Sequence, residues 1–258
     1  MPHEPAELTE TAEDPQGATG LSGATLGPPE HEPVTSLHDP RALQILSTEH
    51  WSLLSARSLA YNEAFTRGGM FLAFLSTSFV ALALVAQAVP IDAGFLVVVA
   101  IVLAFDLVVG LTTYGRIIGA NSEDYRAVHG MARIRHGYGE IAPIVLPYFT
   151  SSAHDDLAGV MVTYGSPPTA GLGAVVYQVT TSGGMIALIA SMVGGVLGLV
   201  VVLNVGASVQ VAVGVGVAAA IAVFVVLAAI TIRYYTAIQA SLEVKFPTPG
   251  ARSPRAGS

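Results

Sequence analysis

The chain lacks cysteine entirely and has few charged side chains, which make up 11% of its 258 residues. Without cysteine it can form no disulfide framework, no thiol nucleophile and no cysteine-based metal site. Soluble domains contain about 25% charged residues, so this low charge and a hydrophobic share of 52% do not fit an ordinary soluble domain. The net charge of -7 gives no indication of a nucleic-acid partner.

Four long apolar runs are present instead, and none of them contains Lys or Arg. They are residues 69–87, 93–114, 184–203 and 209–232. Each has roughly 20 residues, enough for a helix to cross a hydrocarbon core of ~30 Å at ~1.5 Å per residue. The bilayer cannot hydrogen-bond the backbone, and barrel strands are shorter and alternate in polarity. The sequence therefore predicts an all-α, multi-pass membrane protein with four transmembrane helices.

The positive charges predict the topology of these helices. All 11 Lys and Arg residues lie outside the runs and outside the two short turns, 88–92 and 204–208. Because positively charged segments stay in the cytoplasm during insertion, we expect two hairpins that enter from the cytoplasm. The N- and C-termini would then both be cytoplasmic.

The rest of the chain divides around these hairpins. The expected parts are a disordered acidic tail (1–38), a juxtamembrane helix and first hairpin (39–114), a cytoplasmic helical segment (115–183), a second hairpin with a helical extension (184–245) and a disordered tail (246–258). Asp39 and Pro40 suit the start of the juxtamembrane helix. At Gly68 and Gly69 this helix either bends or continues into the first run.

A basic face is predicted on the helix that follows the second run. Arg126, His129, Arg133 and His136 recur at spacings of three and four along residues 117–138. Two interpretations stay open: this face binds anionic lipid headgroups, or it pairs with acidic side chains of neighbouring helices. No metal is expected there, because the histidines are 7 residues apart and lie beside arginines. Further on, Ser152 and Asp155 have the spacing of a capping box.

Asp106 is the sharpest feature, because it lies within the second apolar run. An ionised carboxylate there costs at least ~2.5 kcal/mol on insertion scales. It would therefore be a proton-coupled site, part of a cation-attracting ring in an oligomeric pore, or a polar contact between helices. The structural alternative is a protonated Asp bonded to a hydroxyl such as that of Ser76, Thr77 or Ser78.

Small residues recur every three or four positions in the second hairpin. This spacing lets helix backbones approach closely. The residues predicted to pack helices together are Ser191, Gly194, Gly195, Gly198, Gly214 and Ala218. Packing of the third run on the fourth is favoured over a contact between copies of the chain, but both interpretations stay open.

No pattern in the sequence supports an enzyme. There is no phosphate-binding GxxxxGK[ST] loop and no Gly-x-Ser-x-Gly elbow. We therefore expect no catalytic residue, no cofactor and no metal. The leading expectation is a homo-oligomeric membrane protein that forms a pore or a sensing scaffold; the alternative is a small proton- or cation-coupled transporter that uses Asp106.

Two stretches resemble segments of a group of uncharacterised bacterial membrane proteins with four transmembrane helices. They run from Leu46 to Arg67 and from Met131 to Phe149. No activity is assigned to that group, so the resemblance implies no site residues. A fainter resemblance is to bacterial effector proteins with two spans, although these lack the second hairpin. Either resemblance implies location in the bacterial inner membrane.

Overall fold

A computed structural model of the chain describes residues 33–166 and 171–250. This part is all helical and contains no strand. Its elements are α1 (Pro40–Ala88), α2 (Ala93–Ile141), the 3-10 helix η1 (Pro143–Tyr148), α3 (Leu157–Thr163), α4 (Gly171–Thr180), α5 (Ser182–Asn204) and α6 (Val209–Ser241). Helices α1, α2, α5 and α6 are long and apolar enough to span a membrane. The predicted all-α class and the four apolar helices are thus confirmed.

Residues 1–35 form a separate unit by contacts, and nearly all of it lies outside the described residues, as does most of the predicted tail 1–38. The remaining description concerns residues 36–250. The tail predicted from residue 246 is described only to residue 250. Within it, Phe246 and Thr248 are hydrogen-bonded to the rest of the protein.

The four long helices begin at polar side chains, as helix-capping chemistry requires. In each case a side-chain oxygen accepts a hydrogen bond from a backbone N–H of the first turn. These capping residues are Asp39, Asp92, Thr181 and Ser208. The predicted start of α1, with Asp39 as cap and Pro40 in the first turn, is confirmed.

Helices α1 and α2 are much longer than a bilayer requires. Each has 49 residues, and at ~1.5 Å per residue such a helix is roughly 74 Å long. The hydrocarbon core is only ~30 Å thick. Gly68 and Gly69 lie inside α1 without ending it, so the continuous alternative is the one observed. Both helices therefore continue well beyond their apolar runs.

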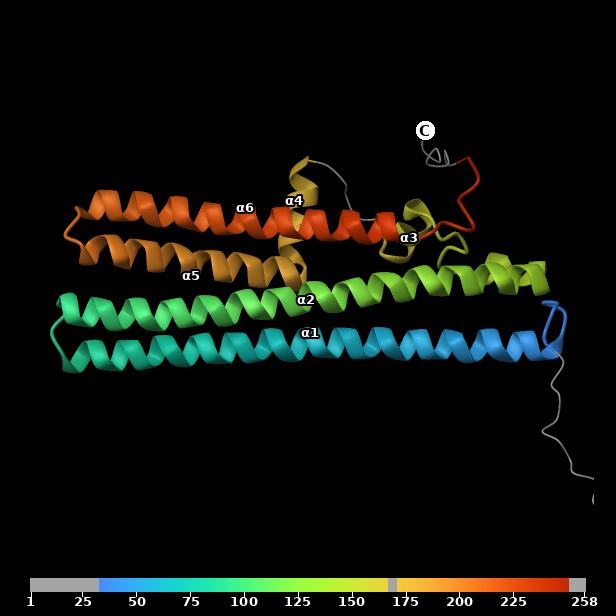
Figure 1. Ribbon diagram of the computed structural model, residues 1–258, viewed down its shortest axis with the longest axis horizontal. Coiled ribbons are helices and arrows are strands. Elements are labelled where there is room, and N and C mark those ends of the chain that lie inside the picture. Colours follow the sequence, from blue (N-terminus) through green and yellow to red (C-terminus); the bar gives the residue numbers. More distant parts are fainter. Residues whose placement is uncertain (1–32, 167–170, 251–258) are drawn as a thin grey trace, which may run out of the picture. The chain divides into compact units, whose positions relative to one another are not determined.

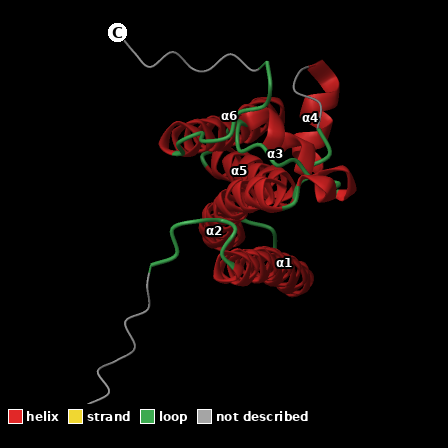
Figure 2. Ribbon diagram, turned by 90° about the vertical axis from the view of Figure 1, so that its right-hand side faces the viewer, coloured by secondary structure: helices red, strands yellow, loops and turns green. Residues whose placement is uncertain are grey.

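The long helices lie side by side in the order α1, α2, α5, α6 (Figure 1). Helix α2 contacts α1 and α5, and α5 contacts α6. The view along the helices shows α2 and α5 between the two outer helices (Figure 2). Helix α4 packs on α5 and crosses the direction of the long helices.

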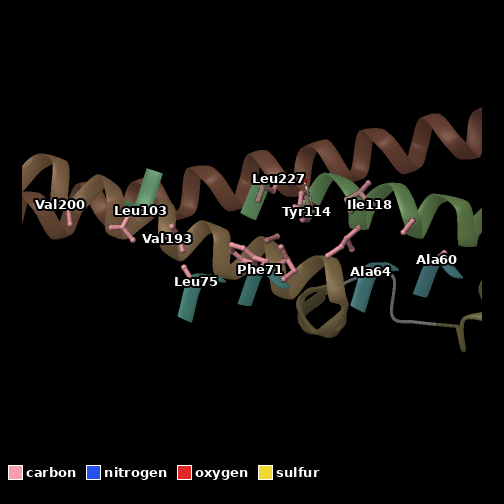
Figure 3. Close-up of a cluster of buried hydrophobic side chains, with 14 residues drawn as sticks. Ala60, Ala64, Phe71, Leu75, Leu103, Tyr114, Ile118, Val193, Val200 and Leu227 are labelled. Atoms are coloured by element: carbon pink, nitrogen blue, oxygen red, sulfur yellow. Dashed lines mark hydrogen bonds between the residues drawn. The ribbon is translucent and has the colours of Figure 1, made fainter. Parts of the chain in front are cut away.

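A buried apolar cluster joins all four long helices, and it extends from their apolar runs to Ala60 and Ala64 of α1 and Ile118 of α2 (Figure 3). It includes Phe71 and Leu75 of α1, Leu103 of α2, Val193 of α5 and Leu227 of α6. Most other large side chains of the apolar runs are exposed, which suits helices whose outer faces meet lipid.

Within the apolar runs, the closest packing of two backbones is between α5 and α6. A Cβ atom added at Gly195 would lie 2.8 Å from the carbonyl oxygen of Gly216 and 2.8 Å from Cβ of Ala220. The small residues of α5 predicted for packing therefore do face another helix of the same chain. On α6 the contact uses Gly216 instead of the predicted stripe, because a Cβ at Gly214 would meet nothing within 4 Å and Ala218 is exposed.

Beyond the apolar runs, the same helices form what we call the polar layer. It consists of residues 40–68 of α1, residues 115–141 of α2, η1, α3 and residues 233–248. A small apolar cluster lies inside it and contains Tyr125, Val128, Val160 and Ile238. Leu53 of α1 packs over Gly130 of α2, where an added Cβ would come within 2.9 Å of the leucine.

Candidate functional site

Asp106 is completely buried between helices, at 0% exposure. The Ser78 hydroxyl of α1 donates a hydrogen bond to Asp106 Oδ1 at 2.9 Å. The other carboxyl oxygen, Oδ2, has no hydrogen-bond partner. Of the three predicted hydroxyl partners, only Ser78 reaches Asp106, because Ser76 and Thr77 bond to carbonyls of their own helix. Asp106 thus forms a polar contact between α1 and α2.

A second buried carboxylate, Asp124 of α2, joins three helices in the polar layer. The Arg57 guanidinium of α1 donates to Asp124 Oδ1 at 2.6 Å, and the Tyr164 hydroxyl beyond α3 donates to Oδ2 at 2.6 Å. Burial and the neighbouring Asp124 carboxylate raise the pKa of the Tyr164 phenol. Tyr164 therefore keeps its proton and remains a donor at neutral pH.

Asp155 forms the third such centre, and it ties the C-terminal segment to α2. Its fully buried carboxylate accepts hydrogen bonds from the backbone N–H of Phe246 at 2.7 Å and of Lys245 at 3.0 Å. The guanidinium of Arg133 donates to it at 2.8 Å. Burial works against ionisation, but these donors outweigh it, so the pKa of Asp155 lies below its usual value. Asp155 is a charged anchor for residues 245–246.

The predicted capping box at Ser152 and Asp155 is wrong. The cap of α3 is Asp156, which accepts from the backbone N–H of Gly159 at 3.0 Å. Ser152 Oγ accepts instead from the backbone N–H of His154, within the preceding loop. Asp155 could not serve as part of the box because its carboxylate faces residues 245–246. Thr248 donates to the capping Asp156 at 2.7 Å and extends the same connection.

The four residues of the predicted basic face have different environments. Arg126 is exposed. His129 is 4% exposed, and its Nε2 has no hydrogen-bond partner. Arg133 pairs with Asp155, and His136 stacks on Phe246 with ring centroids 3.9 Å apart. Pairing with acidic neighbours therefore describes Arg133, whereas binding of lipid headgroups stays a prediction for Arg126.

His129 lies in a place unsuited to a positive charge. Its burial and the nearby Arg133 lower the pKa of the imidazole, although Asp155 acts in the opposite direction. The Asp155 carboxylate is 3.8 Å from His129 Nε2, too far for a hydrogen bond. His129 is thus a neutral side chain enclosed by the polar layer at neutral pH.

Histidines also line a cavity of about 460 Å³ beside η1. Its lining includes His136, His154 and Glu140. The two imidazole centroids are 6.4 Å apart, and His136 Nε2 is 3.4 Å from Glu140. Within residues 33–166 and 171–250, no three His, Cys, Asp or Glu side chains are arranged to hold a metal ion.

The centres at Asp124 and Asp155 could not be predicted from the sequence, because their partners are far apart along the chain. Arg57 precedes Asp124 by 67 residues, and Lys245 follows Asp155 by 90. Comparison of the chain with protein-family models, with curated proteins and with solved structures finds no match. The candidate centres at Asp106, Asp124 and Asp155 are therefore defined by their geometry alone.

Proposed function

We propose that this chain is a non-enzymatic integral protein of the bacterial inner membrane that acts as an oligomeric sensing or scaffold component. In this proposal, α1 with α2 and α5 with α6 form two transmembrane hairpins. The polar layer lies in the cytoplasm, because it carries the Lys and Arg residues that flank the apolar runs. Both termini are then cytoplasmic.

One observation carries this proposal: α1 and α2 pass unbroken from their apolar runs into the polar layer, where ion pairs join them. Arg57 pairs with the buried Asp124, and Glu63 pairs with Arg116 at 2.5 Å on a more exposed side of the two helices. A rigid helix transmits a displacement from one end to the other, and breaking a buried ion pair is costly. A shift of the two spans relative to each other would therefore change the geometry of the cytoplasmic layer.

An exposed aromatic stripe on α1 supports the oligomeric part of the proposal. Trp51, Leu54, Tyr61 and Phe65 recur at the spacing of a coiled-coil seam and are 68%, 40%, 46% and 75% exposed. Trp51 precedes Gly69 by eighteen residues, roughly 27 Å along a helix, which takes it far from the apolar run. Copies anchored in one membrane would present this stripe at the same height.

A specific feature favours the alternative, a transporter that uses Asp106. Its Oδ2 is buried and has no hydrogen-bond partner, and intramembrane carboxyl groups often mark proton pathways. However, Asp106 lines neither the cavity beside η1 nor the cavity bordered by α2, α4, α5 and α6. The scaffold proposal fits better because the carboxyl group already links Ser78 to α2.

Reconstitution into liposomes separates the two proposals. Flux driven by a pH gradient and the assembly state are measured for the wild type and for Asp106→Asn, which keeps an acceptor for Ser78. We expect no pH-dependent flux from either protein and the same assembly state for both. Wild-type flux that Asp106→Asn abolishes would overturn the scaffold proposal in favour of the transporter.

The oligomeric part has its own experiment. Trp51→Ala removes the largest side chain of the aromatic stripe, and Ser52→Ala is the control at an exposed neighbouring position. We expect Trp51→Ala to shift the detergent-solubilised protein to a smaller species, measured by light scattering, while Ser52→Ala leaves the mass unchanged. A monomeric wild-type protein would contradict the oligomer.

A further inference from the structure

A second cavity, of about 490 Å³, lies where α2, α4, α5 and α6 meet. This size is typical of small-molecule sites. The side chains that line it are Tyr114, Ala174, Val175, Gln178, Val179, Ala187, Phe224, Ala228, Thr231, Ile232, Tyr235, Thr236 and Gln239. None of them carries a full charge at neutral pH, so the cavity suits an uncharged group.

The lining changes from apolar to polar along α6. Phe224 and Ala228 lie within the fourth apolar run, whereas Thr236 and Gln239 follow it in the polar layer. At the apolar end, the hydroxyl of Tyr114 is hydrogen-bonded to Thr231 and to the carbonyl of Leu227. Tyr114 therefore presents no unpaired polar group to the cavity. The cavity therefore has an apolar end and an end with amide and hydroxyl groups.

Helix α4 forms one wall of this cavity. It contains no charged residue, and its outer face exposes Leu172 at 79% and Val176 at 55%. An apolar helix face of this kind lies stably at the boundary between lipid and water. Ala174 and Val179, which are partly buried, face the cavity. The cavity thus opens at the level where the fourth apolar run ends.

We propose that this cavity binds one acyl chain of a phospholipid from the cytoplasmic leaflet. The chain would occupy the apolar end beside Phe224 and Ala228, and the ester oxygens would accept hydrogen bonds from the side-chain amides of Gln178 and Gln239. The order of the lining supports this occupant, because a membrane lipid has the same order of apolar chain, ester groups and water-facing head. The inference rests on the proposed membrane topology and adds a ligand to it.

Such a lipid would be the ligand that the proposed sensing function requires. It would contact α4, α5 and α6 at once, and Tyr114 would bring α2 into the same contact. Tyr235, whose pKa burial raises to about 12, also lines the polar end. Its phenol therefore stays protonated and available as a donor to an ester oxygen.

Photolabelling in liposomes tests this inference. The probe is a phosphatidylcholine with a diazirine on one acyl chain, and the labelled residues are mapped by mass spectrometry. We expect label at Ala174 or Val179 on the inner face of α4 as well as on the four spans. If the spans are labelled but α4 is not, the lipid site is wrong; if the spans are not labelled either, the membrane topology is wrong.

A matched pair of variants shows whether the label on α4 comes from the cavity. Ala228→Trp fills the apolar end, and Val225→Trp places the same side chain on the exposed face of α6, where Val225 is 56% exposed. We expect Ala228→Trp to lower labelling of α4 about tenfold, since an indole takes up the space of the chain, and Val225→Trp to leave it unchanged.

Two further outcomes would overturn the lipid site. One is equal labelling of α4 in the two tryptophan variants. The other is labelling of Ala174 and Val179 by a water-soluble diazirine but not by the lipid probe, which would make the cavity aqueous. If Ala228→Trp does not fold, the wild-type map with the two probes still decides between lipid and water.

Discussion

The two halves of α1 and α2 are held together by different forces. Within the apolar runs, the only hydrogen bond between side chains of these helices in the described residues is that of Ser78 with Asp106. In the polar layer the same helices are joined by Arg57 with Asp124 and by Glu63 with Arg116. A bilayer offers no hydrophobic drive to pack helices, so the contact of α1 with α2 in the apolar runs depends on the shape of the packed surfaces. In the polar layer, ion pairs and apolar burial together stabilise the contact.

The four long helices also differ in how much of their most apolar part is buried. In the most apolar part of α5, 44% of the residues are buried, compared with 11% in each of α1 and α6. Helix α5 is buried most because it packs against α2 on one side and against α6 on the other, where Gly195 and Gly216 bring the backbones together. Helix α5 is therefore the packed centre of the apolar half, and Asp155 and Asp124 are the centres of the polar layer.

The largest effect is expected from removing the Asp155 carboxylate. Asp155→Ala leaves Arg133 and the N–H groups of Lys245 and Phe246 without their acceptor, which should cost about 3 kcal/mol. Thermal unfolding of the detergent-solubilised protein, monitored by proteolysis near residue 245, measures this cost. Glu140→Ala is the control, since its side chain is 51% exposed. Equal effects of the two variants would contradict the account of the layer.

A smaller effect is expected in the apolar half. Gly195→Ala places a Cβ 2.8 Å from a backbone oxygen that cannot move aside alone, and such overpacking costs roughly 1–3 kcal/mol. Gly214→Ala adds the same atom where nothing lies within 4 Å, so it should be neutral or stabilise the helix by up to ~1 kcal/mol. Detergent-unfolding curves of the two variants make the comparison, and a more harmful Gly214→Ala would contradict it.

The contact of Ser78 with Asp106 should contribute less. Ser78→Ala removes the only side-chain donor to Asp106 in the described part of the chain and should cost about 0.6–1.7 kcal/mol, the range for hydrogen bonds between membrane helices. Thr77→Ala is the control, because the Thr77 hydroxyl bonds only to a carbonyl of its own helix. The same unfolding curves report both, and an unaffected Ser78→Ala would show that the contact does not stabilise the helix pair.

The smallest effect is the pH dependence due to His129. Its pKa in the folded protein is below the unfolded value, so the unfolded chain takes up the proton first as the pH falls. The contribution of His129 to the free energy of unfolding is fully present above about pH 6.5. Below that pH it declines by on the order of 1 kcal/mol or less over one pH unit. His129→Leu should reduce this decline, and the exposed His38→Leu should not. An unchanged profile for His129→Leu would contradict the assignment.

The pKa of Asp155 gives a separate and more acidic window. Because its folded pKa lies below the unfolded one, its contribution is present above about pH 4 and is lost as the pH falls toward the folded value. The half-buried His50 shares the histidine window, since partial burial also lowers its pKa. Loss of stability between pH 6.5 and 4 therefore reports on the histidines and not on Asp155.

Local patterns in the sequence predicted the helices, but they did not predict contacts between residues far apart along the chain. The apolar runs marked the four long helices, and Asp39 marked the start of α1 because a cap acts within one turn. The same local argument failed at Ser152, where Asp155 bonds to residues 90 positions away. Periodicity placed His129 and Arg133 on one face, but it contained nothing about the segment that covers them.

The candidate contact at Asp106 was predictable in kind, because a buried carboxyl group needs a hydroxyl partner. Ser76, Thr77 and Ser78 were equivalent by composition, and only the rotation of α1 selects Ser78. The stripe of Gly214 and Ala218 was placed on a packing face by spacing alone. The structure turns it outward, since α6 meets α5 through Gly216.

Labelling of single cysteines in intact cells tests the central claim most directly, because the chain has no cysteine of its own. Ala88 and Val205 lie at the two turns, while Ser55 and Glu123 lie exposed in the polar layer. With an impermeant maleimide we predict that Ala88→Cys and Val205→Cys react, and that Ser55→Cys and Glu123→Cys react only after lysis. Reaction of Glu123→Cys in intact cells, or a turn that reacts only after lysis, would contradict the topology.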